Sequence, residues 1–205
     1  MKFEKSQFAE AIGLWTEWNG RINVVSRKDI DNLFEHHILH SLAIAEYMDR
    51  SGLIPPPGDC PDAPMRILDV GCGGGFPGIP LAMVMPGIDF TLCDSIGKKI
   101  SVAQSVADAL GLKNVRCVNA RAESLPGQYD WIVSRAVTSL DNFYPWVKGK
   151  FIKGILYLKG GDVNEEIASL CRKCRISPSD VTVWPVSDWL DDDYFAEKFV
   201  IHIRK

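Results

Sequence analysis

The sequence predicts an α/β fold: a Rossmann-like sandwich with a mostly parallel, seven-stranded sheet, helices on both faces, and a helical amino-terminal layer. Three observations predict it. After Pro64, short apolar runs alternate with stretches of helical periodicity, which is the pattern of parallel strands joined by helices. The apolar run 67–70 passes directly into a glycine-rich turn and then back into helical spacing. Before Pro55, the apolar residues follow helical spacing.

Three segments are expected along the chain. Residues 1–54 form the helical amino-terminal layer, 55–64 form a linker, and 65–205 form the core. The linker is predicted because the stretch Pro55-Pro56-Pro57-Gly58 cannot continue a helix.

Two helices are predicted in the amino-terminal layer. The first covers residues 3–19 and ends at Asn19-Gly20, and a short extended segment, 21–26, follows it. We expect the carboxylate of Asp29 to cap the second helix. The apolar face of that helix consists of Ile30, Leu33, Phe34, His37, Ile38, Ser41, Leu42 and Ala45.

The core is expected to contain strands and helices in alternation, with two more strands near the end of the chain. The predicted strands are 66–70, 88–93, 115–119, 130–134, 154–158, 180–184 and 197–203, and the predicted helices are about 77–85, 96–110, 139–150 and 163–173.

Composition limits the classes of function. The net charge of −3 argues against a free-standing binder of naked nucleic acid, which usually carries a basic excess. No apolar run is long enough to span a membrane, and the amino terminus lacks the layout of a signal peptide. We therefore expect a soluble, cytoplasmic protein without a membrane partner.

No metal site is expected. Cys171 and Cys174 have C-x-x-C spacing, but a zinc site needs two further ligands, and His202 is a poor candidate. Cys60, like most of the six cysteines, has no suggestive spacing. The run Asp191-Asp192-Asp193 is interpreted as a solvated loop.

The glycine-rich turn, with five glycines in residues 71–78, predicts a cofactor site. A dinucleotide fingerprint requires a small third residue, but Phe76 stands there, and no phosphate-loop lysine is present. The pattern D-x-G-x-G-x-G instead resembles the first motif of class I S-adenosylmethionine-dependent methyltransferases. Glycines let the backbone approach the cofactor closely. We assign cofactor contacts to Asp69, Gly71, Gly73 and Gly75.

Two later strand ends extend this site. Asp94 ends the second predicted strand, and its two carboxylate oxygens suit the two hydroxyls of a ribose. Ser95 follows it directly. After the third strand, the backbone of Ala122 and the side chain of Glu123 are candidates for contact with adenine, although an ordinary loop explains this spacing equally well.

Other motifs exclude some substrates. The fourth strand lacks the N/D-P-P-Y/F motif that amino-group methyltransferases of nucleic acids often carry. The cysteines offer no obvious nucleophile of the kind that a cytosine-C5 enzyme needs. A reaction without a covalent intermediate is therefore favoured.

Several motifs, in order along most of the chain, resemble the bacterial small-subunit rRNA guanine-N7 methyltransferase family, also called the glucose-inhibited division protein B family. Its F-P-G-I-P-L and S-R-A pieces are the most diagnostic. The matching pieces are Asn23-Val24-Val25-Ser26, His36-His37-Ile38-Leu39-His40-Ser41-Leu42, Leu68 to Ala82, Asp94 to Lys99, Ala120 to Glu123, Ser134-Arg135-Ala136 and Leu158-Lys159-Gly160.

The resemblance implies S-adenosylmethionine as cofactor, S-adenosylhomocysteine as product, and 16S rRNA as substrate, methylated at N7 of a guanine in the 530 loop (position 527). It places Gly71, Phe76, Ala122, Glu123 and Arg135 around the cofactor. The chain departs from the family at two positions: His40 stands where Asp is usual, and Lys99 where Arg is frequent. The second change keeps the charge but loses bidentate geometry.

The implied chemistry needs no strong base, because guanine N7 has a lone pair and no proton. It can attack the sulfonium methyl in line, while the protein supplies alignment. We assign this catalytic alignment to Arg135 and Arg121, for which a surface salt bridge is the alternative. The expected RNA contacts are Arg21, Asn23, His36, Lys98 and Lys159, of which the histidine can stack on bases.

Alternatives remain open at this point. A small-molecule methyltransferase and a cofactor-binding regulatory protein without catalysis both accommodate the glycine turn. A dehydrogenase is disfavoured by Phe76. The substrate is either free RNA or an assembling small subunit, and we expect a monomer.

Overall fold

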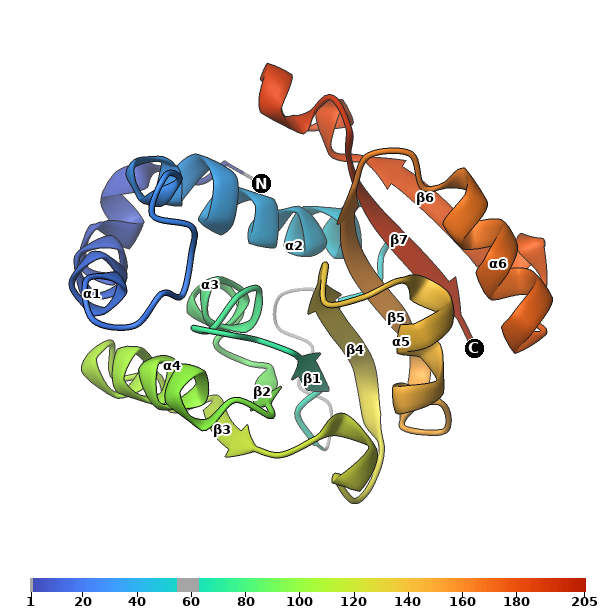
Figure 1. The fold of residues 1–205 in the computed structure, drawn as a ribbon, viewed down its shortest axis with the longest axis horizontal. Helices are drawn as coiled ribbons and strands as arrows, with labels where there is room; N and C mark the ends of the chain where they lie inside the picture. Colours follow the sequence, from blue (N-terminus) through green and yellow to red (C-terminus); the bar gives the residue numbers. More distant parts are fainter. Residues whose placement is uncertain (1, 55–62) are drawn as a thin grey trace.

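A central sheet organises the computed structural model, which describes residues 2–54 and 63–205. Within these residues seven strands form one sheet in the order β3-β2-β1-β4-β5-β7-β6 (Figure 1). Strands β1 to β5 pair in parallel, and β7 is antiparallel to both β5 and β6. The strands are β1 (Arg66–Val70), β2 (Asp89–Asp94), β3 (Val115–Asn119), β4 (Tyr129–Arg135), β5 (Phe151–Gly160), β6 (Val181–Pro185) and β7 (Lys198–Arg204).

Helices cover both faces of the sheet. Side chains alternate along each strand, so that Ile67 joins one hydrophobic cluster with α1 to α4, whereas Leu68 joins another with α5 and α6. In Figure 1 the blue and green helices lie on one side of the strands and the orange helices on the other. The helices are α1 (Ala9–Asn19), α2 (His40–Arg50), α3 (Gly78–Val84), α4 (Gly97–Ala109), α5 (Leu140–Val147) and α6 (Asn164–Cys174).

The predicted α/β sandwich is thereby confirmed, and most predicted strands and helices begin and end within one or two residues of the observed ones. The first predicted helix, 3–19, is a 3₁₀ helix over Lys5–Phe8 followed by α1, which begins at Ala9. Two elements of the core also differ. β5 begins at Phe151, three residues before the predicted start at 154, and α5 ends at Val147 instead of 150. The turn Lys148-Gly149 accounts for both differences: Lys148 leaves the helical conformation with ψ of 125°, and Gly149, with φ of +82°, turns the chain into β5.

The second amino-terminal helix also differs from the prediction. It consists of a short 3₁₀ turn, a π-helical stretch over Leu33–Leu39, and then α2. Asp29 precedes this composite helix, but its side chain makes no capping hydrogen bond to the helix. The expected cap is therefore wrong: the carboxylate is paired with His36 and His37 instead. The 3₁₀ helices along the described chain are Lys5–Phe8, Ile30–Asn32, Ala122–Ser124, Pro178–Asp180, Val186–Asp188 and Asp193–Phe195.

The amino-terminal layer packs directly on the core. Trp15 of α1 and Leu42 of α2 have no exposed surface and belong to the same hydrophobic cluster as Ile79 of α3 and Leu92 of β2. Most of the predicted linker, residues 55–62, lies outside the described residues. The layer and the sheet therefore share one continuous interior on this face.

Three features noted in the sequence can be compared with the structure: the absence of a long apolar run, the cysteines and the acidic run at 191–193. In the part of the chain that the structure describes, no helix is long and apolar enough to cross a membrane. Cys171 and Cys174 lie on α6, half-buried and free, whereas Cys60 lies outside the described residues. Asp191, Asp192 and Asp193 are exposed, and no group of three or more potential metal ligands gathers among the described residues.

A buried polar pair joins α2 to the sheet. The Tyr47 hydroxyl and His202 Nδ1 lie 3.0 Å apart, and the ring of His202 packs against Trp131 of β4. His202 is only 5% exposed, and its Nε2 has no hydrogen-bond partner among the described residues. Burial lowers the pKa of His202 from its ordinary value of 6.5 to about 4, with a smaller effect from Arg204. The imidazole is therefore neutral at pH 7.

This pair predicts that acid destabilises the fold. As pH falls from about 6.5 to about 4, the unfolded chain binds a proton that folded His202 does not, so the free energy of unfolding decreases. Urea unfolding at pH 7.5 and pH 5 measures this decrease in the free energy of unfolding. The decrease should be smaller in His202→Gln. It should persist in Tyr47→Phe, which removes the hydrogen bond but keeps the imidazole. An equal loss in wild type and His202→Gln would show that His202 does not titrate in this way.

Candidate cofactor and methyl-transfer site

The glycine turn after β1 is held by backbone hydrogen bonds. The N–H groups of Gly71 and Cys72 donate to the carbonyl of Cys93 in β2, at 2.8 and 3.2 Å. Those of Gly75 and Phe76 both donate to the carbonyl of Cys72 at 2.8 Å. The turn is thereby fixed to the carboxyl end of the neighbouring strand.

Glycine is required at Gly71 for two separate reasons. Its φ is +71°, a conformation that residues with a Cβ rarely adopt, and a Cβ there would lie 2.3 Å from Cγ1 of Val137. Gly73 also has a positive φ, of +55°, but nothing lies within 4 Å of the position of its missing Cβ. The first glycine permits close packing against the segment after β4, whereas the second leaves open space beside the turn.

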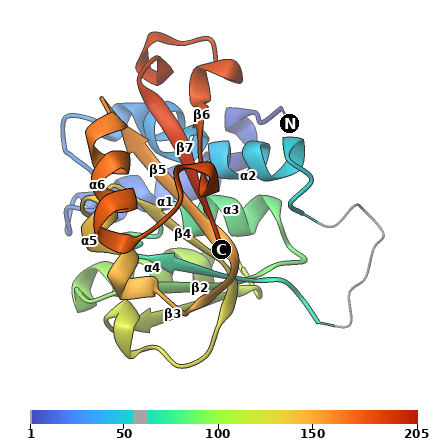
Figure 2. The same cartoon turned by 90° about the vertical axis from the view of Figure 1, so that its right-hand side faces the viewer.

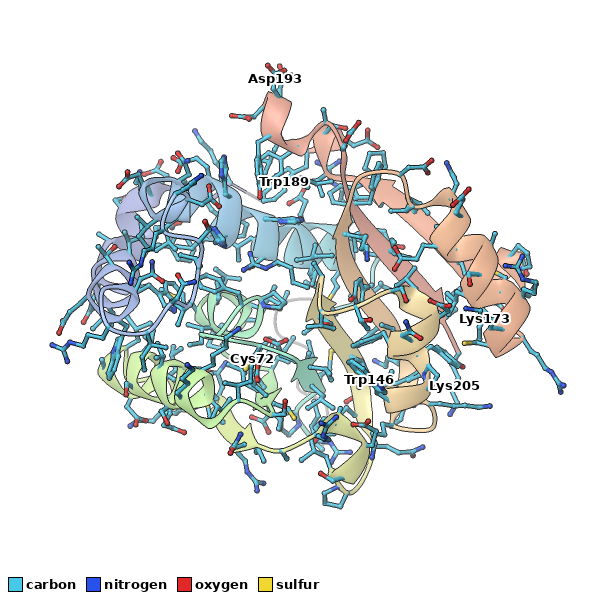
Figure 3. The ribbon with its side chains drawn as sticks, in the orientation of Figure 1. Cys72, Trp146, Lys173, Trp189, Asp193 and Lys205 are labelled. Carbon is cyan, nitrogen blue, oxygen red and sulfur yellow. The ribbon has the colours of Figure 1, made fainter. Side chains whose placement is uncertain are left out.

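That open space belongs to a cavity of about 490 Å³ at the carboxyl ends of β1 to β4. This is the edge of an open parallel sheet at which ligands bind. Figure 3 shows Cys72 and Trp146, which reach the cavity from the glycine turn and from α5. The lining residues are Val24, Val70, Gly71, Cys72, Gly73, Gly74, Phe76, Cys93, Asp94, Ser95, Ile96, Lys99, Ala120, Arg121, Ala122, Glu123, Arg135, Ala136, Val137 and Trp146.

Most residues predicted to contact the cofactor meet in this cavity, but two do not line it. Asp69 is completely buried behind the turn, where its Oδ2 accepts a hydrogen bond from the N–H of Gly78 at 2.8 Å. Gly75 is also buried, with its missing Cβ directed at Ile79. Burial raises the pKa of Asp69 to about 8. The structure thus places Asp69 as a support of the turn.

Asp94 is oriented by the turn on one side and by its own strand end on the other. Its Oδ2 accepts a hydrogen bond from the N–H of Gly73 at 2.9 Å, and its Oδ1 accepts one from the N–H of Ile96 at 2.8 Å. A carboxylate has about four acceptor positions, so two hydrogen bonds leave capacity for a ligand. The predicted role in binding ribose hydroxyls is compatible with this geometry.

The loop after β3 supplies the third wall. Ala122 is buried in a short 3₁₀ helix, while Arg121 and Glu123 on either side of it are exposed at the cavity rim. Sequence reasoning missed Trp146, because only the packing of α5 beside this loop brings it to the cavity. It also missed Val24 as a wall residue, although the residue belongs to a quoted motif.

Arg135, at the end of β4, lies between the cavity and the amino-terminal layer. Its guanidinium is 5.0 Å from the centre of the Phe76 ring, and its Nη2 donates to Nδ1 of His37 at 3.1 Å. Phe76 in turn packs on Trp15 with ring centres 4.3 Å apart, and Trp15 Nε1 donates to the Gly74 carbonyl at 2.8 Å. Burial lowers the pKa of Arg135 to about 10, so it remains a cation at neutral pH.

The backbone after Arg135 turns sharply. Ala136 has a φ of +47°, which is unusual for a residue with a Cβ. The hydroxyl of Tyr157 in β5 secures the turn: it accepts hydrogen bonds from the N–H groups of Val137 and Thr138, and it donates to the Thr138 carbonyl at 2.8 Å. Such strained backbone is commonly found at functional sites.

The residues predicted to contact RNA are distributed unequally. Arg21, Asn23 and Lys98 are exposed, the first in an ion pair with Glu17. Lys159 is less available, because its Nζ donates to Glu166 at 2.9 Å and to the Thr138 carbonyl.

His36 is also engaged within the protein. Its Nδ1 lies 2.5 Å from Asp29, and its ring stacks on Tyr194 at 3.6 Å. One face of the imidazole is therefore already covered. Of the two departures from the family pattern, Lys99 lines the cavity, whereas His40 is buried and packs edge-on against Tyr194 and Phe195.

Comparisons with known sequences identify close relatives. A family model for GidB, the rRNA small subunit methyltransferase G, matches residues 4–188. The chain is 46% identical over 205 residues to the ribosomal RNA small subunit methyltransferase G of Cytophaga hutchinsonii, covering 96% of this chain and 90% of the relative. It is 44% identical to the protein of the same name from Flavobacterium psychrophilum, covering 97% and 90%.

Solved structures agree at the level of the fold. Magnesium protoporphyrin IX methyltransferase from Synechocystis, with bound SAM, has a TM-score of 0.64 at 13% identity, covering 100% of this chain and 99% of its own. The 16S rRNA N2 G1207 methyltransferase of T. thermophilus, in complex with AdoMet and guanosine, has a TM-score of 0.57 at 16% identity, covering 90% and 44%. The expectation of a class I methyltransferase fold is confirmed.

The cavity suits this cofactor on its own geometry. The open side of Gly73 accepts close approach of a ligand, Asp94 offers free acceptor positions, and the buried Ala122 presents backbone without a long side chain. We therefore expect S-adenosylmethionine in the cavity, where it supplies an electrophilic methyl group.

Gly71 and Gly73, the two glycines of the turn with positive φ that line the cavity, give a first test. Gly73→Ala should lower the free energy of unfolding by roughly 1–2 kcal/mol, the cost of a left-handed backbone conformation. Gly71→Ala should lower it further, because the new Cβ also collides with Val137. Urea denaturation measures both, and Val137→Ala should recover part of the second loss. Equal losses in the two single variants would contradict the close packing.

Asp94 gives a second test. Asp94→Asn should weaken S-adenosylhomocysteine binding about 10- to 100-fold, because hydrogen bonds to a charged group contribute about 1.5–3 kcal/mol. Isothermal titration calorimetry measures the Kd. Asp89→Asn, at the exposed opposite end of β2, is the matched control and should bind like wild type. An unchanged Kd in Asp94→Asn would remove Asp94 from the binding site.

Proposed function

Because the chain belongs to the rRNA small subunit methyltransferase G family, we propose that it methylates N7 of a guanine in 16S rRNA, in the 530 loop, in a single in-line transfer. The protein is an S-adenosylmethionine-dependent rRNA methyltransferase. The observation that carries the finer proposal is the place of Arg135, a half-buried cation at the wall of the cofactor cavity.

A single transfer is supported by the state of the cysteines in the cavity wall. Cys72 is buried, and burial raises the pKa of its thiol well above the ordinary value. The pKa of Cys93 is raised to about 11 for the same reason. Both thiols are therefore protonated at neutral pH and poor nucleophiles. Guanine N7 needs no such nucleophile, since its own lone pair attacks the methyl group.

Arg135 is proposed to hold the base. Guanine presents O6 and N7 as neighbouring acceptors on one edge, and N7 must stay free for reaction. A guanidinium that donates only to O6 aligns the edge and leaves N7 open. The methylated guanine is cationic, so the arginine acts by alignment rather than by stabilising the product charge. Arg121, exposed at the rim, is proposed to contact an RNA phosphate.

The RNA is proposed to approach the face that carries Arg21, Asn23 and Lys98, which are exposed on the amino-terminal loop and at the start of α4. Arg21 and Lys98 supply local positive charge in a chain of net charge −3, and the amide of Asn23 offers uncharged hydrogen-bonding groups. The contributions of Lys159 and His36 to RNA binding, the monomeric state, the cytoplasmic location and the choice between free 16S rRNA and the small subunit remain predictions.

Mapping of the methylated base tests the proposal. Labelled S-adenosylmethionine is incubated with 16S rRNA, or with small subunits, from cells that lack the enzyme. N7-methylguanine is then located by reduction and aniline cleavage, which break the chain at that base. Label at one guanine N7 in the 530 loop supports the proposal, and label at another atom contradicts it. Cofactor binding without turnover would favour a regulatory protein without catalysis. Methyl transfer at the same rate with and without RNA would favour a small-molecule methyltransferase.

Substitution of Arg135 tests the role of this residue. Arg135→Ala should lower kcat about 100-fold, since misalignment by about 1 Å has effects of this size. Arg135→Lys should recover only part, because an ammonium lacks the planar donor geometry. The control is Arg66→Ala, an exposed arginine at the opposite end of the sheet. Single-turnover kinetics measure the rates, and an active Arg135→Ala would refute the alignment role.

A further inference from the structure

We propose that His37 is a positioning residue for Arg135, and that Asp29 holds His37 in the one tautomer that can perform this role. The inference deepens the proposed function, on which the catalytic importance of Arg135 rests. It concerns a chain of contacts, here called the Arg135 clamp, that consists of Asp29, His37, Arg135 and Phe76.

The hydrogen bonds of the clamp determine the tautomer. Arg135 Nη2 lies 3.1 Å from Nδ1 of His37, and a guanidinium only donates, so Nδ1 must carry the lone pair. The ring proton then resides on Nε2, which lies 2.7 Å from Oδ2 of Asp29, an acceptor. Both ring nitrogens thus have the partner that this tautomer requires. A second Arg135 nitrogen, Nη1, points to the carbonyl of His37 at 3.5 Å.

His37 is also kept neutral, as an acceptor must be. Burial and the adjacent Arg135 guanidinium lower the pKa of His37 from 6.5 to about 4, although Asp29 opposes this. The side chain is 13% exposed, which restricts competing water.

Asp29 is itself fixed from a second direction. Its Oδ1 lies 2.5 Å from Nδ1 of His36, so the carboxylate joins two consecutive histidines of the π-helical stretch. Tyr194 stacks on His36 with ring planes only 6° apart, and its hydroxyl donates to the His36 carbonyl at 3.2 Å. Figures 1 and 2 both show the segment between β6 and β7 extending over the amino-terminal layer, which is how Tyr194 reaches His36.

On its other side, the guanidinium faces the Phe76 ring. Phe76 belongs to the glycine turn and is braced by Trp15, so its position is coupled to the cofactor cavity. The guanidinium is therefore held between the turn that binds the cofactor and a histidine of the amino-terminal layer. Both the direction of the Arg135 side chain and the orientation of its planar guanidinium are therefore restricted.

Three substitutions of His37 separate the two hydrogen bonds. Asn places an amide oxygen near the position of Nδ1 and keeps the acceptor for Arg135, whereas Gln places an amide near the position of Nε2 and keeps the contact with Asp29. Phe keeps a ring and loses both. We expect His37→Gln and His37→Phe to lower kcat about 10- to 100-fold, and His37→Asn to lower it less than about fivefold. The Kd for S-adenosylhomocysteine should stay within about twofold of wild type in all three.

A buried histidine outside the site provides the control. His202 is 5% exposed and pairs with Tyr47 of α2, but it does not line the cavity. The kcat of His202→Gln should stay close to that of wild type. If His202→Gln and His37→Gln lose activity equally, His37 only braces the amino-terminal layer and the proposal is wrong.

A double-mutant cycle distinguishes positioning from a general structural role. His37→Gln should lower kcat in the protein with Arg135 but have no further effect in Arg135→Ala, because nothing remains to be positioned. Equal effects in both backgrounds would overturn the proposal. Loss of activity in Arg135→Ala with a wild-type rate in His37→Gln would refute the clamp and leave the proposed function intact.

A readout without turnover keeps the clamp testable if the proposed function fails. ¹⁵N NMR of the ring nitrogens of His37 in the wild-type protein at pH 7 reports the tautomer directly. The clamp requires the proton on Nε2 and a bare Nδ1, and Arg135→Ala should alter the Nδ1 signal. A proton on Nδ1, or a signal indifferent to Arg135→Ala, would refute it whatever the protein methylates.

Discussion

The structure depends on one steric constraint: the backbone of the glycine turn passes closer to its neighbours than a Cβ allows. A Cβ at Gly71 would collide with Val137 after β4, one at Gly74 with Val24 of the amino-terminal layer, and one at Gly78 with Asp69 of β1. Three parts of the chain therefore meet at the turn at contact distance. The cavity takes its walls from all three, so its shape depends on the absence of these side chains.

Hydrogen bonds around the turn fix the orientation of the polar groups that face the cavity. Asp94 is oriented by two backbone N–H groups and Tyr157 secures the loop after Arg135, so each acts through bonds made before any ligand arrives. Preorganisation of this kind reduces the reorganisation that a ligand or transition state requires. The amino-terminal layer takes part in the site, because it supplies Trp15 beneath Phe76 and His37 beside Arg135.

The fold alone does not account for the substrate. Methyltransferases as different as one acting on magnesium protoporphyrin IX and one acting on 16S rRNA share it at 13–16% identity with this chain. What differs among them must lie in side chains placed on the common frame. For this chain we propose that they are Arg121 at the cavity rim and Arg135 with the partners that restrict it.

Much of this could be read from the sequence, because the signals are local. Alternating apolar runs, Pro64 and the glycines determined the strands and helices, and the D-x-G-x-G-x-G turn with Asp94 located the cofactor site. The pairing of Asp29 with the two histidines, the stacking of Tyr194 on His36 across 158 residues, the complete burial of Asp69 and the approach of Trp146 were decided only by tertiary structure. Tyr194 and His36 are far apart in the chain, and Asp29 meets its two histidines, seven and eight residues on, only because the π-helical stretch turns both rings toward it. A local pattern states which face of an element is buried, but not which residue it meets there.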